Sequence, residues 1–429
     1  MKSPDKLPSL VYANYKGEIV DLPDIEMAGM SGFSMIRPHY SDLIPLPNGS
    51  ELFTLPGRYP IGIDPKNKSF IKLDEDPFYE GKPVSAVAAF IAPAHTSILS
   101  AAYEKSDSSA PVLPLFAYTT VGWLDGQFWV AAFRCDSDVR QDADQYVQKT
   151  VKAKTDKYLK RFCDNRLIQH LGNCCLSYGC PAARNYFLGR WEAPIPTSPI
   201  CNANCVGCIS LQTSGCCPST QDRISFVPAV DEIVEMAVPH LSDAPMPVVS
   251  FGQGCEGEPL LQFKTIEKAI IKMRAQTPLG TINLNSNASM PDRIDRLAAS
   301  GLDSLRVSMN SARKDKYALY YRPQGFSFDE VKDSIKVMKR RNKFVSLNYF
   351  ILPGFTDDMD EMSALFDLVE DCKPDMIQLR NLNMDPEWYL DVIKHSPVAK
   401  PKGIMNWLKR LKKSFPFLRF GYFNPYLAG

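Results

Sequence analysis

Residues 201–208 read Cys-Asn-Ala-Asn-Cys-Val-Gly-Cys, which is a C-x3-C-x2-C run of three cysteines. A loop this short can wrap three thiolates around one face of a four-iron cluster, so that they bind three irons and leave the fourth iron open. The alternative is a zinc knuckle, but a structural zinc site needs four closed ligands, commonly two C-x2-C pairs at a distance. The run therefore favours an iron–sulfur cluster with one open iron.

A glycine-rich motif follows this run further along the chain. Residues 248–251 are the apolar stretch Val-Val-Ser-Phe, and residues 252–259 read Gly-Gln-Gly-Cys-Glu-Gly-Glu-Pro. Glycines allow a close approach of backbone to a ligand, although the same composition also suits a plain turn between a strand and a helix. Because the motif accompanies the cysteine run, we interpret it as a ligand site at the end of a strand.

Short apolar runs alternate with amphipathic segments from residue 199 onward. The runs interpreted as buried strands cover residues 247–251, 281–285, 304–309, 345–352 and 376–379. The segments with helical periodicity cover residues 265–275, 292–300, 327–340, 360–371 and 403–415. This alternation predicts βα units and a parallel sheet, which binds ligands at the carboxyl ends of its strands.

Three further motifs lie at predicted strand ends, namely Asn285-Ser286-Asn287, Arg306-Val307-Ser308-Met309-Asn310 and Tyr349-Phe350-Ile351-Leu352-Pro353-Gly354. With the cysteine run and Gly-Glu-Pro, and in this order, they resemble the radical SAM superfamily over residues 199 to 385. The resemblance implies an α/β fold with a partial (β/α)6 TIM-like barrel. It places the three motifs after the fourth strand, on the fifth and at the end of the sixth.

The resemblance also implies the roles of individual residues. The metal ligands would be Cys201, Cys205 and Cys208, which hold a [4Fe-4S] cluster. The residues that would bind S-adenosylmethionine are Gly257, Glu258, Pro259, Ser286, Asn287, Ser308, Asn310 and Gly354, with Glu258 receiving the methionyl amino group. One departure is Gly207, which stands where family members usually carry an aromatic residue that stacks on the adenine.

The activity implied by the resemblance is reductive cleavage of S-adenosylmethionine to a 5′-deoxyadenosyl radical, which abstracts hydrogen from a substrate. No side chain need act as an acid or base, so we nominate no catalytic residue. A reductant such as ferredoxin or flavodoxin is the expected partner. The alternatives are an activase of a partner radical enzyme, an RNA-modifying enzyme and a non-enzymatic iron–sulfur binding protein.

Composition bounds the class of protein. The chain of 429 residues is 45% hydrophobic and 11% aromatic, which excludes a disordered or collagen-like chain. Lys and Arg total 49 against 48 for Asp and Glu, so no bulk field attracts nucleic acid or anionic lipid. Because the N-terminus lacks the apolar core of a secretory signal and no run of about 20 apolar residues occurs, we expect a cytoplasmic protein with no membrane partner.

The residues before the cysteine run have a different texture. Recurrent prolines predict short strands up to about residue 120, and Asp125-Gly126 predicts a tight hairpin between two apolar runs. Residues 137–170 show one long amphipathic stretch of helical spacing. We therefore expect an N-terminal β-rich domain over 1–140, a helical, cysteine-containing connector over 141–198 and the barrel with its extension over 199–429. An edge strand of the β-rich domain could present a peptide or protein substrate.

Nine of the twelve cysteines lie between Cys163 and Cys217. In a reducing compartment such crowding is more typical of metal or redox sites than of disulfides. The cysteines that would hold a second site, an auxiliary iron–sulfur cluster, are Cys163, Cys174, Cys175, Cys180, Cys216 and Cys217. The alternatives are a structural zinc site or buried reduced cysteines.

Overall fold

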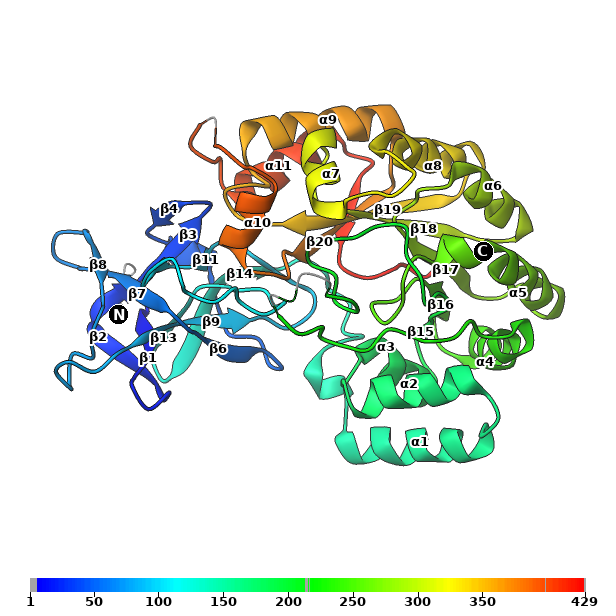
Figure 1. The fold of residues 1–429 in the computed structure, drawn as a ribbon, viewed down its shortest axis with the longest axis horizontal. Coiled ribbons are helices and arrows are strands. Elements are labelled where there is room, and N and C mark those ends of the chain that lie inside the picture. Colours follow the sequence, from blue (N-terminus) through cyan, green and yellow to red (C-terminus); the bar gives the residue numbers. More distant parts are fainter. Residues whose placement is uncertain (1–5, 213–214, 216, 398, 428–429) are drawn as a thin grey trace. The chain divides into compact units, whose positions relative to one another are not determined.

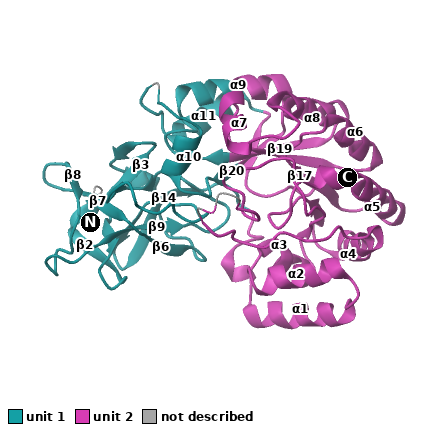
Figure 2. Ribbon diagram, in the orientation of Figure 1, with its two compact units in different colours: residues 1–137, 350–364, 379–416 teal, residues 138–349, 365–378, 417–429 magenta. Residues whose placement is uncertain are grey.

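The computed structural model describes residues 6–212, 215, 217–397 and 399–427. The chain divides into two compact units, and each unit consists of three separate segments of the sequence (Figure 2). Unit 1 contains residues 1–137, 350–364 and 379–416, and unit 2 contains residues 138–349, 365–378 and 417–429. Among the described residues, no helix has both the length and the apolar character needed to cross a membrane.

Unit 1 is built mainly from short antiparallel strands, as its prolines predict. An 11-stranded sheet contains β1 (Ser9–Ala13), β2 (Ile19–Met27), β5 (Leu43–Pro45), β6 (Glu51–Leu55), β7 (Arg58–Ile63), β8 (Phe70–Lys72), β9 (Ser85–Phe90), β10 (His95–Ser97), β12 (Tyr103–Lys105), β13 (Val121–Leu124) and β14 (Gln127–Arg134). A second, three-stranded sheet contains β3 (Gly29–Ser31), β4 (Ser34–Ile36) and β11 (Ser100–Ala101). The expected β-rich N-terminal region is confirmed.

The predicted hairpin is also confirmed. Strands β13 and β14 pair antiparallel, with Leu124 opposite Gln127. The two residues between them, Asp125 and Gly126, have φ angles of 52° and 82°. Positive φ at both positions is what a two-residue hairpin turn requires, which explains the Asp-Gly pair.

A buried ion pair joins the β-rich part of unit 1 to its later segment. The Arg58 guanidinium on β7 lies 2.6 Å from the Asp385 carboxylate, and both side chains are buried. Asp385 is the N-cap of α10 (Pro386–Val392) and also accepts a hydrogen bond from the Leu113 backbone N–H. The Asp385 carboxylate thus accepts from a guanidinium, from a loop N–H and from the first N–H groups of α10. These contacts hold residues 379–416 against the strands of unit 1. Unit 1 also contains α11 (Ile404–Ser414) and η1 (Tyr40–Asp42).

Unit 2 begins with a layer of helices. The prediction of one long amphipathic stretch over residues 137–170 is wrong, because this stretch contains separate helices. It contains η2 (Ala143–Gln145) and α1 (Gln148–Arg161) and then breaks before α2 (Arg166–Leu176), which is followed by α3 (Pro181–Leu188). The side chain of Asn165 accepts from the Ile168 N–H and starts α2, so a helix cap interrupts the periodic pattern.

A seven-stranded parallel sheet follows, with its strands in the order β15, β16, β17, β18, β19, β20 and β21. The strands are β15 (Glu192–Ile195), β16 (Val248–Phe251), β17 (Thr281–Ser286), β18 (Ser304–Met309), β19 (Phe344–Ile351), β20 (Met376–Asn381) and β21 (Arg419–Gly421). The intervening helices are α4 (Val230–Asp243), η3 (Pro259–Gln262), α5 (Phe263–Gln276), α6 (Pro291–Ser300), α7 (Lys314–Tyr321), α8 (Phe328–Arg340) and α9 (Met359–Cys372). The division between units runs through β19, α9 and β20.

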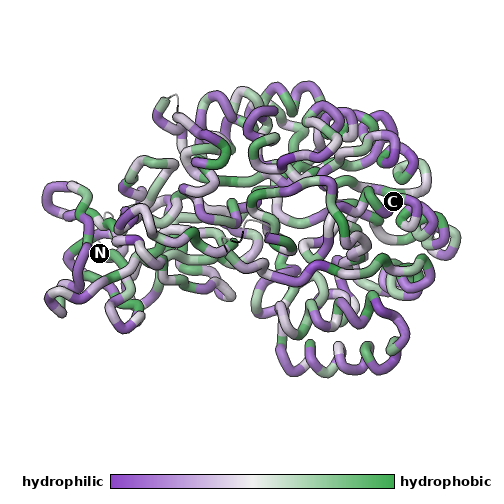
Figure 3. Tube along the Cα trace, viewed as in Figure 1, coloured by the Kyte–Doolittle hydropathy of each residue, from purple (hydrophilic) through white to green (hydrophobic). Residues whose placement is uncertain are grey.

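Within unit 2 the helices α4, α5, α6 and α8 lie along the outer side of the curved sheet (Figure 1). Hydrophobic residues concentrate along the strands, whereas hydrophilic and hydrophobic residues alternate around the helices (Figure 3). This is the layering of a partial TIM barrel, so the predicted mixed α/β fold is confirmed. All five strands and all five helices predicted from residue 247 onward are present.

The predicted positions of the strands in the sheet need one correction. The structure has β15 as the first strand, and no strand lies between β16 and β17. Asn285 and its neighbours therefore end the third strand rather than the fourth, and Ser308 lies on the fourth rather than the fifth. By the same count Gly354 follows the fifth strand rather than the sixth.

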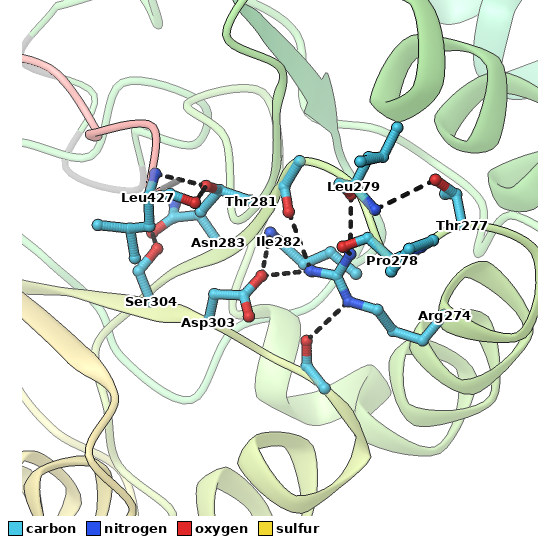
Figure 4. Close-up of polar contacts among 12 residues, drawn as sticks. Arg274, Thr277, Pro278, Leu279, Thr281, Ile282, Asn283, Asp303, Ser304 and Leu427 are labelled. Atoms are coloured by element: carbon cyan, nitrogen blue, oxygen red, sulfur yellow. Dashed lines mark hydrogen bonds and ion pairs between the residues drawn. The ribbon is translucent and has the colours of Figure 1, made fainter. Parts of the chain in front are cut away.

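A network of polar contacts fixes the amino ends of two barrel strands (Figure 4). The Arg274 guanidinium at the end of α5 forms an ion pair with Asp303 and donates to the Leu279 carbonyl at 2.9 Å. The Asp303 carboxylate also accepts from the Ile282 N–H at 2.8 Å. One arginine thus ties α5 to the starts of β17 and β18, at the edge of the sheet opposite the carboxyl ends.

Candidate functional site

The cysteine run follows β15 and its backbone is held by α7. The Asn204 N–H donates to the Tyr321 carbonyl at 3.0 Å, and the Val206 N–H donates to the Tyr320 carbonyl at 3.1 Å. The loop is therefore fixed by main-chain contacts, while each of its three cysteines is partly exposed and free of a disulfide.

The Gly-Glu-Pro segment packs directly against the start of the cysteine run. The Gly257 N–H donates to the Ser198 carbonyl at 2.7 Å, and the Glu258 N–H donates to the Ile200 carbonyl at 2.8 Å. A Cβ atom at position 257 would lie 2.0 Å from the Ile200 carbonyl oxygen. Glycine is thus required because the cysteine loop, rather than a ligand, fills the space that its side chain would need.

The Glu258 carboxylate ties the ends of two strands together. Its side chain is 3% exposed. One oxygen accepts from the Ser286 hydroxyl at 2.6 Å and the Leu260 N–H at 2.9 Å, and the other accepts from the Asn287 N–H at 2.8 Å. Burial raises the pKa of Glu258 to about 7 in spite of these hydrogen bonds. A carboxylate accepts about four hydrogen bonds, so one acceptor position remains for a cationic donor.

Amide and hydroxyl side chains extend this contact back to the cysteine run. The Asn287 side-chain amide donates to the Asn202 Oδ1 atom at 2.8 Å, and the Asn202 amide donates to the Ser289 hydroxyl at 3.0 Å. Ser286, Asn287 and Glu258 are therefore brought together with the cysteine loop.

The other predicted ligand contacts occupy varied places. Pro259 is buried and begins η3. Ser308 lies on β18 opposite Asn348, and the buried Asn310 donates to the Lys316 carbonyl at 3.3 Å. All of these residues belong to unit 2, as Glu258 does.

Gly354 belongs to unit 1, and its backbone there explains the glycine. Its φ is +90°, and a Cβ atom would lie 1.9 Å from the Gly32 nitrogen. The Gly32 N–H donates to the Pro353 carbonyl at 2.7 Å. The absence of a side chain therefore serves packing within unit 1, and a contact between Gly354 and adenine stays a prediction.

Sequence reasoning missed one arginine at the cysteine run. The Arg223 guanidinium donates to the Cys208 sulfur at 3.4 Å and to the Ser210 hydroxyl at 3.2 Å. Hydrogen bonds to thiolate sulfurs influence the potential of an iron–sulfur cluster. No local spacing in the sequence indicated this contact, because Arg223 lies 15 residues beyond Cys208.

Tyr317 is a second residue whose importance the structure reveals. Its side chain is fully buried, and its hydroxyl has no hydrogen-bond partner among the described residues. Burial raises the pKa of Tyr317 well above its usual value, and the nearby Cys205 and Glu258 raise it further. An unpartnered hydroxyl beside these two groups fits a site completed by a ligand.

The three cysteines fit an iron–sulfur cluster. Among the described residues, one set of metal-ligating side chains has all its ligand atoms within 4.8 Å of one another, and it includes none of the three. Thiolates that bind different irons of a cluster must stand further apart than the ligands of a single ion. Burial raises the pKa of Cys201 to about 11 and that of Cys205 well above its usual value. Metal binding would therefore release protons from these thiols.

The described cysteines of the predicted second site have different surroundings. Cys163 is exposed, Cys217 is partly exposed, and Cys216 lies outside the described residues. Cys180 is the N-cap of α3. Cys175 lies on α2, with its sulfur 3.4 Å from the Thr155 hydroxyl. An auxiliary cluster stays a prediction.

Cys174 has different neighbours from the rest of that set. Its sulfur lies 3.6 Å from the His170 Nε2 atom. The ligand atoms of His170, Cys174 and Cys255 all lie within 4.8 Å of one another. A hydrogen bond from the Cys255 thiol lowers the pKa of Cys174 to about 5, and the same bond raises the pKa of Cys255. His170 and Cys255 were not among the predicted ligands.

The fold and the site together define a class of protein, an α/β protein with a partial barrel and a loop of three free cysteines after its first strand. Residues 195–366 match the sequence model of the Radical SAM superfamily. That stretch of the chain is accordingly a radical SAM domain, and its reaction is unassigned. This family uses a [4Fe-4S] cluster and S-adenosylmethionine, and it needs a reductant. A comparison with curated proteins found no match.

Several solved structures are similar at low identity. SuiB of Streptococcus suis bound to its precursor peptide SuiA is 13% identical, with a TM-score of 0.37, over 59% of this chain and 52% of that chain. Methylornithine synthase (PylB) is 15% identical, with a TM-score of 0.38, over 57% of this chain and 68% of that chain. A radical SAM methyltransferase from Sphaerobacter thermophilus is 14% identical, with a TM-score of 0.37, over 54% and 66% of the two chains. The matched part thus spans about half the length of SuiB.

We predict that Gly257→Ala lowers the iron content of the reconstituted protein. The added Cβ would displace the Ile200 carbonyl and with it the start of the cysteine run. Iron analysis after anaerobic reconstitution measures the effect. The control is Gly325→Ala. Gly325 has a φ of +78°, so the substitution strains the backbone, but the added Cβ would meet no atom within 4 Å. Equal iron in the two variants would contradict the prediction.

Proposed function

We propose that Cys201, Cys205 and Cys208 hold the [4Fe-4S] cluster and that Glu258 receives the amino group of S-adenosylmethionine. The observation that carries this proposal is the backbone contact between residues 198–200 and residues 257–258, with hydrogen bonds of 2.7 and 2.8 Å. It brings the three thiols and the buried carboxylate onto adjoining stretches of chain. When bound, the cluster supplies the electron for reductive cleavage of S-adenosylmethionine.

The residues of this chain then bind and orient the cofactor. Glu258 is held in one orientation by three donors, and its remaining acceptor position suits an ammonium group. Ser286 and Asn287 complete that surface, while Ser308 and Asn310 are proposed contacts for the carboxylate or ribose. A rigid, water-poor surface of this kind favours one reactive geometry. The proposed reductant is a ferredoxin or flavodoxin.

The proposed substrate is a peptide or protein segment that binds the edge of unit 1. Among the described strands, β6 pairs with β9 alone, so its second edge leaves backbone donors and acceptors unpaired. The partly exposed Phe53 on this strand lies 4.6 Å from the Phe116 ring, measured between centroids. An open edge beside an aromatic pair suits addition of an extended chain.

Hydrogen exchange tests the substrate proposal. A peptide substrate should slow amide exchange over Glu51–Leu55 and leave Phe70–Lys72 unchanged. The second segment is the matched control, because β8 also pairs with one described strand only, β7. If a peptide that the protein converts leaves the amide exchange rate over β6 unchanged, the edge-addition proposal is wrong. The cofactor proposal would not be affected.

Replacement of the three cysteines tests the cluster assignment. The Cys201→Ala, Cys205→Ala, Cys208→Ala variant should lose the iron of the cluster and the production of 5′-deoxyadenosine, because no other residue of the loop can ligate iron. Iron analysis and chromatography measure both. Cys372→Ala is the control, since Cys372 is a buried cysteine at the end of α9. Undiminished 5′-deoxyadenosine from the triple variant would show that the assignment is wrong.

A matched pair of glutamates tests the role of Glu258. Glu258→Gln should weaken S-adenosylmethionine binding by about 10-fold or more with near-normal iron, because a charge-assisted hydrogen bond is lost. Glu256→Gln is the control. Glu256 is also buried, accepts from the Thr197, Ser198 and Gln253 N–H groups, and has its pKa raised by burial to about 7.

Both substitutions place an amide where a carboxylate met several donors, so both should lower the melting temperature by a similar amount. Calorimetric titration and thermal unfolding separate binding from stability. Equal cofactor affinity in the two variants would show that Glu258 has only a structural role.

A further inference from the structure

Three side chains of metal-ligating type meet within unit 2, away from the cysteine run in sequence. His170 and Cys174 are four residues apart on α2, so they lie on one face of the helix. Cys255 comes from the loop after β16. All three ligand atoms lie within 4.8 Å of one another, and no other such group occurs in the part of the chain that the structure describes.

The spacing of these atoms fits one metal ion. In a tetrahedral site with Zn–S near 2.3 Å and Zn–N near 2.0 Å, neighbouring ligand atoms stand roughly 3.5–3.8 Å apart. The distance from the Cys174 sulfur to the His170 Nε2 atom is 3.6 Å. An iron–sulfur cluster would instead require thiolates separated widely enough to bind different irons.

The surroundings suit a bound cation. Cys174 and Cys255 are 2% and 5% exposed, whereas His170 is partly exposed, so the group is closed on one side and reachable on the other. The carboxylate of Asp222 interacts electrostatically with Cys174 and accepts a hydrogen bond from the Tyr178 hydroxyl at 2.7 Å. This side chain supplies nearby negative charge that a divalent cation would favour.

We propose that His170, Cys174 and Cys255 bind one Zn²⁺ ion, with water in the fourth coordination position. Mixed sulfur and nitrogen ligands are the donor set that zinc prefers. The site is distinct from the cluster loop, because none of its ligands belongs to that loop. It also differs from the auxiliary iron–sulfur cluster expected from the crowded cysteines.

The ion would fix the loop that carries Glu258. Cys255 stands three residues before Glu258, and its carbonyl accepts from the Ile224 N–H at 2.8 Å. A bond from zinc to Cys255 would therefore join α2, the segment around Ile224 and the end of β16. The metal acts as a positioning element, and its binding does not depend on the radical chemistry.

The test uses the full chain with Cys201, Cys205 and Cys208 replaced by alanine, so that the cluster loop cannot bind zinc. After incubation with Zn²⁺ and gel filtration, elemental analysis should find one zinc per chain. Adding Cys174→Ser, Cys255→Ser or His170→Gln should abolish that zinc. Adding Cys175→Ser should retain it, because Cys175 is the adjacent cysteine and contacts Thr155 instead.

Co²⁺ substitution gives a second measurement. The triple-alanine variant, with no further substitution, should show a thiolate-to-cobalt charge-transfer band. If a serine variant unfolds, as judged by circular dichroism, the partly exposed His170→Gln variant and the cobalt spectrum decide. Three results would each overturn the proposal: absence of both zinc and the cobalt band, zinc retained after loss of His170 and Cys174, or iron with sulfide in place of zinc.

Discussion

The structure depends on a close backbone contact between the segment that leads into Cys201 and the segment 257–258. Two N–H groups of the second segment donate to two carbonyls of the first, and the contact leaves no room for a side chain at position 257. Because β15 precedes one segment and β16 precedes the other, the contact joins two neighbouring strand ends. The cysteine run therefore has a fixed place relative to Glu258 before any cofactor binds.

The segment that makes this contact contains two buried carboxylates within three residues, Glu256 and Glu258, and their desolvation costs free energy of folding. Burial raises the pKa of both Glu256 and Glu258 to about 7. Each carboxylate is offset by several backbone and hydroxyl donors, which recover much of the free energy that desolvation costs. Glu256 draws its donors from the strand-end loops alone, whereas Glu258 retains an acceptor position beside the cysteine run. The two carboxylates thus differ: the donors to Glu256 all belong to the loop contact, whereas Glu258 has one acceptor position left.

The barrel could be predicted from the sequence because its strands are apolar runs flanked by helices of clear periodicity. The first strand was missed for a physical reason. Residues 192–195 read Glu-Ala-Pro-Ile, and neither a charged residue nor a proline is typical of a buried strand. Proline is tolerated because β15 is the edge of the sheet, and Glu192 is satisfied by Ser250 and Asn424.

The two proposed sets of metal ligands differ in how far the sequence can reveal them. The cluster triad is local, since eight consecutive residues carry all three thiolates and their spacing is visible at once. The second group is composite. The four-residue spacing of His170 and Cys174 is visible in the sequence. Cys255 lies near them only because the fold brings the loop after β16 to that face of α2. The crowding of cysteines in the sequence also predicted Cys175 and Cys180 as ligands. Cys175 is adjacent to Cys174 on α2 but contacts Thr155, and Cys180 is the N-cap of α3. Proximity along the chain therefore predicts ligands within one loop, whereas a site shared between a helix and a loop requires the fold.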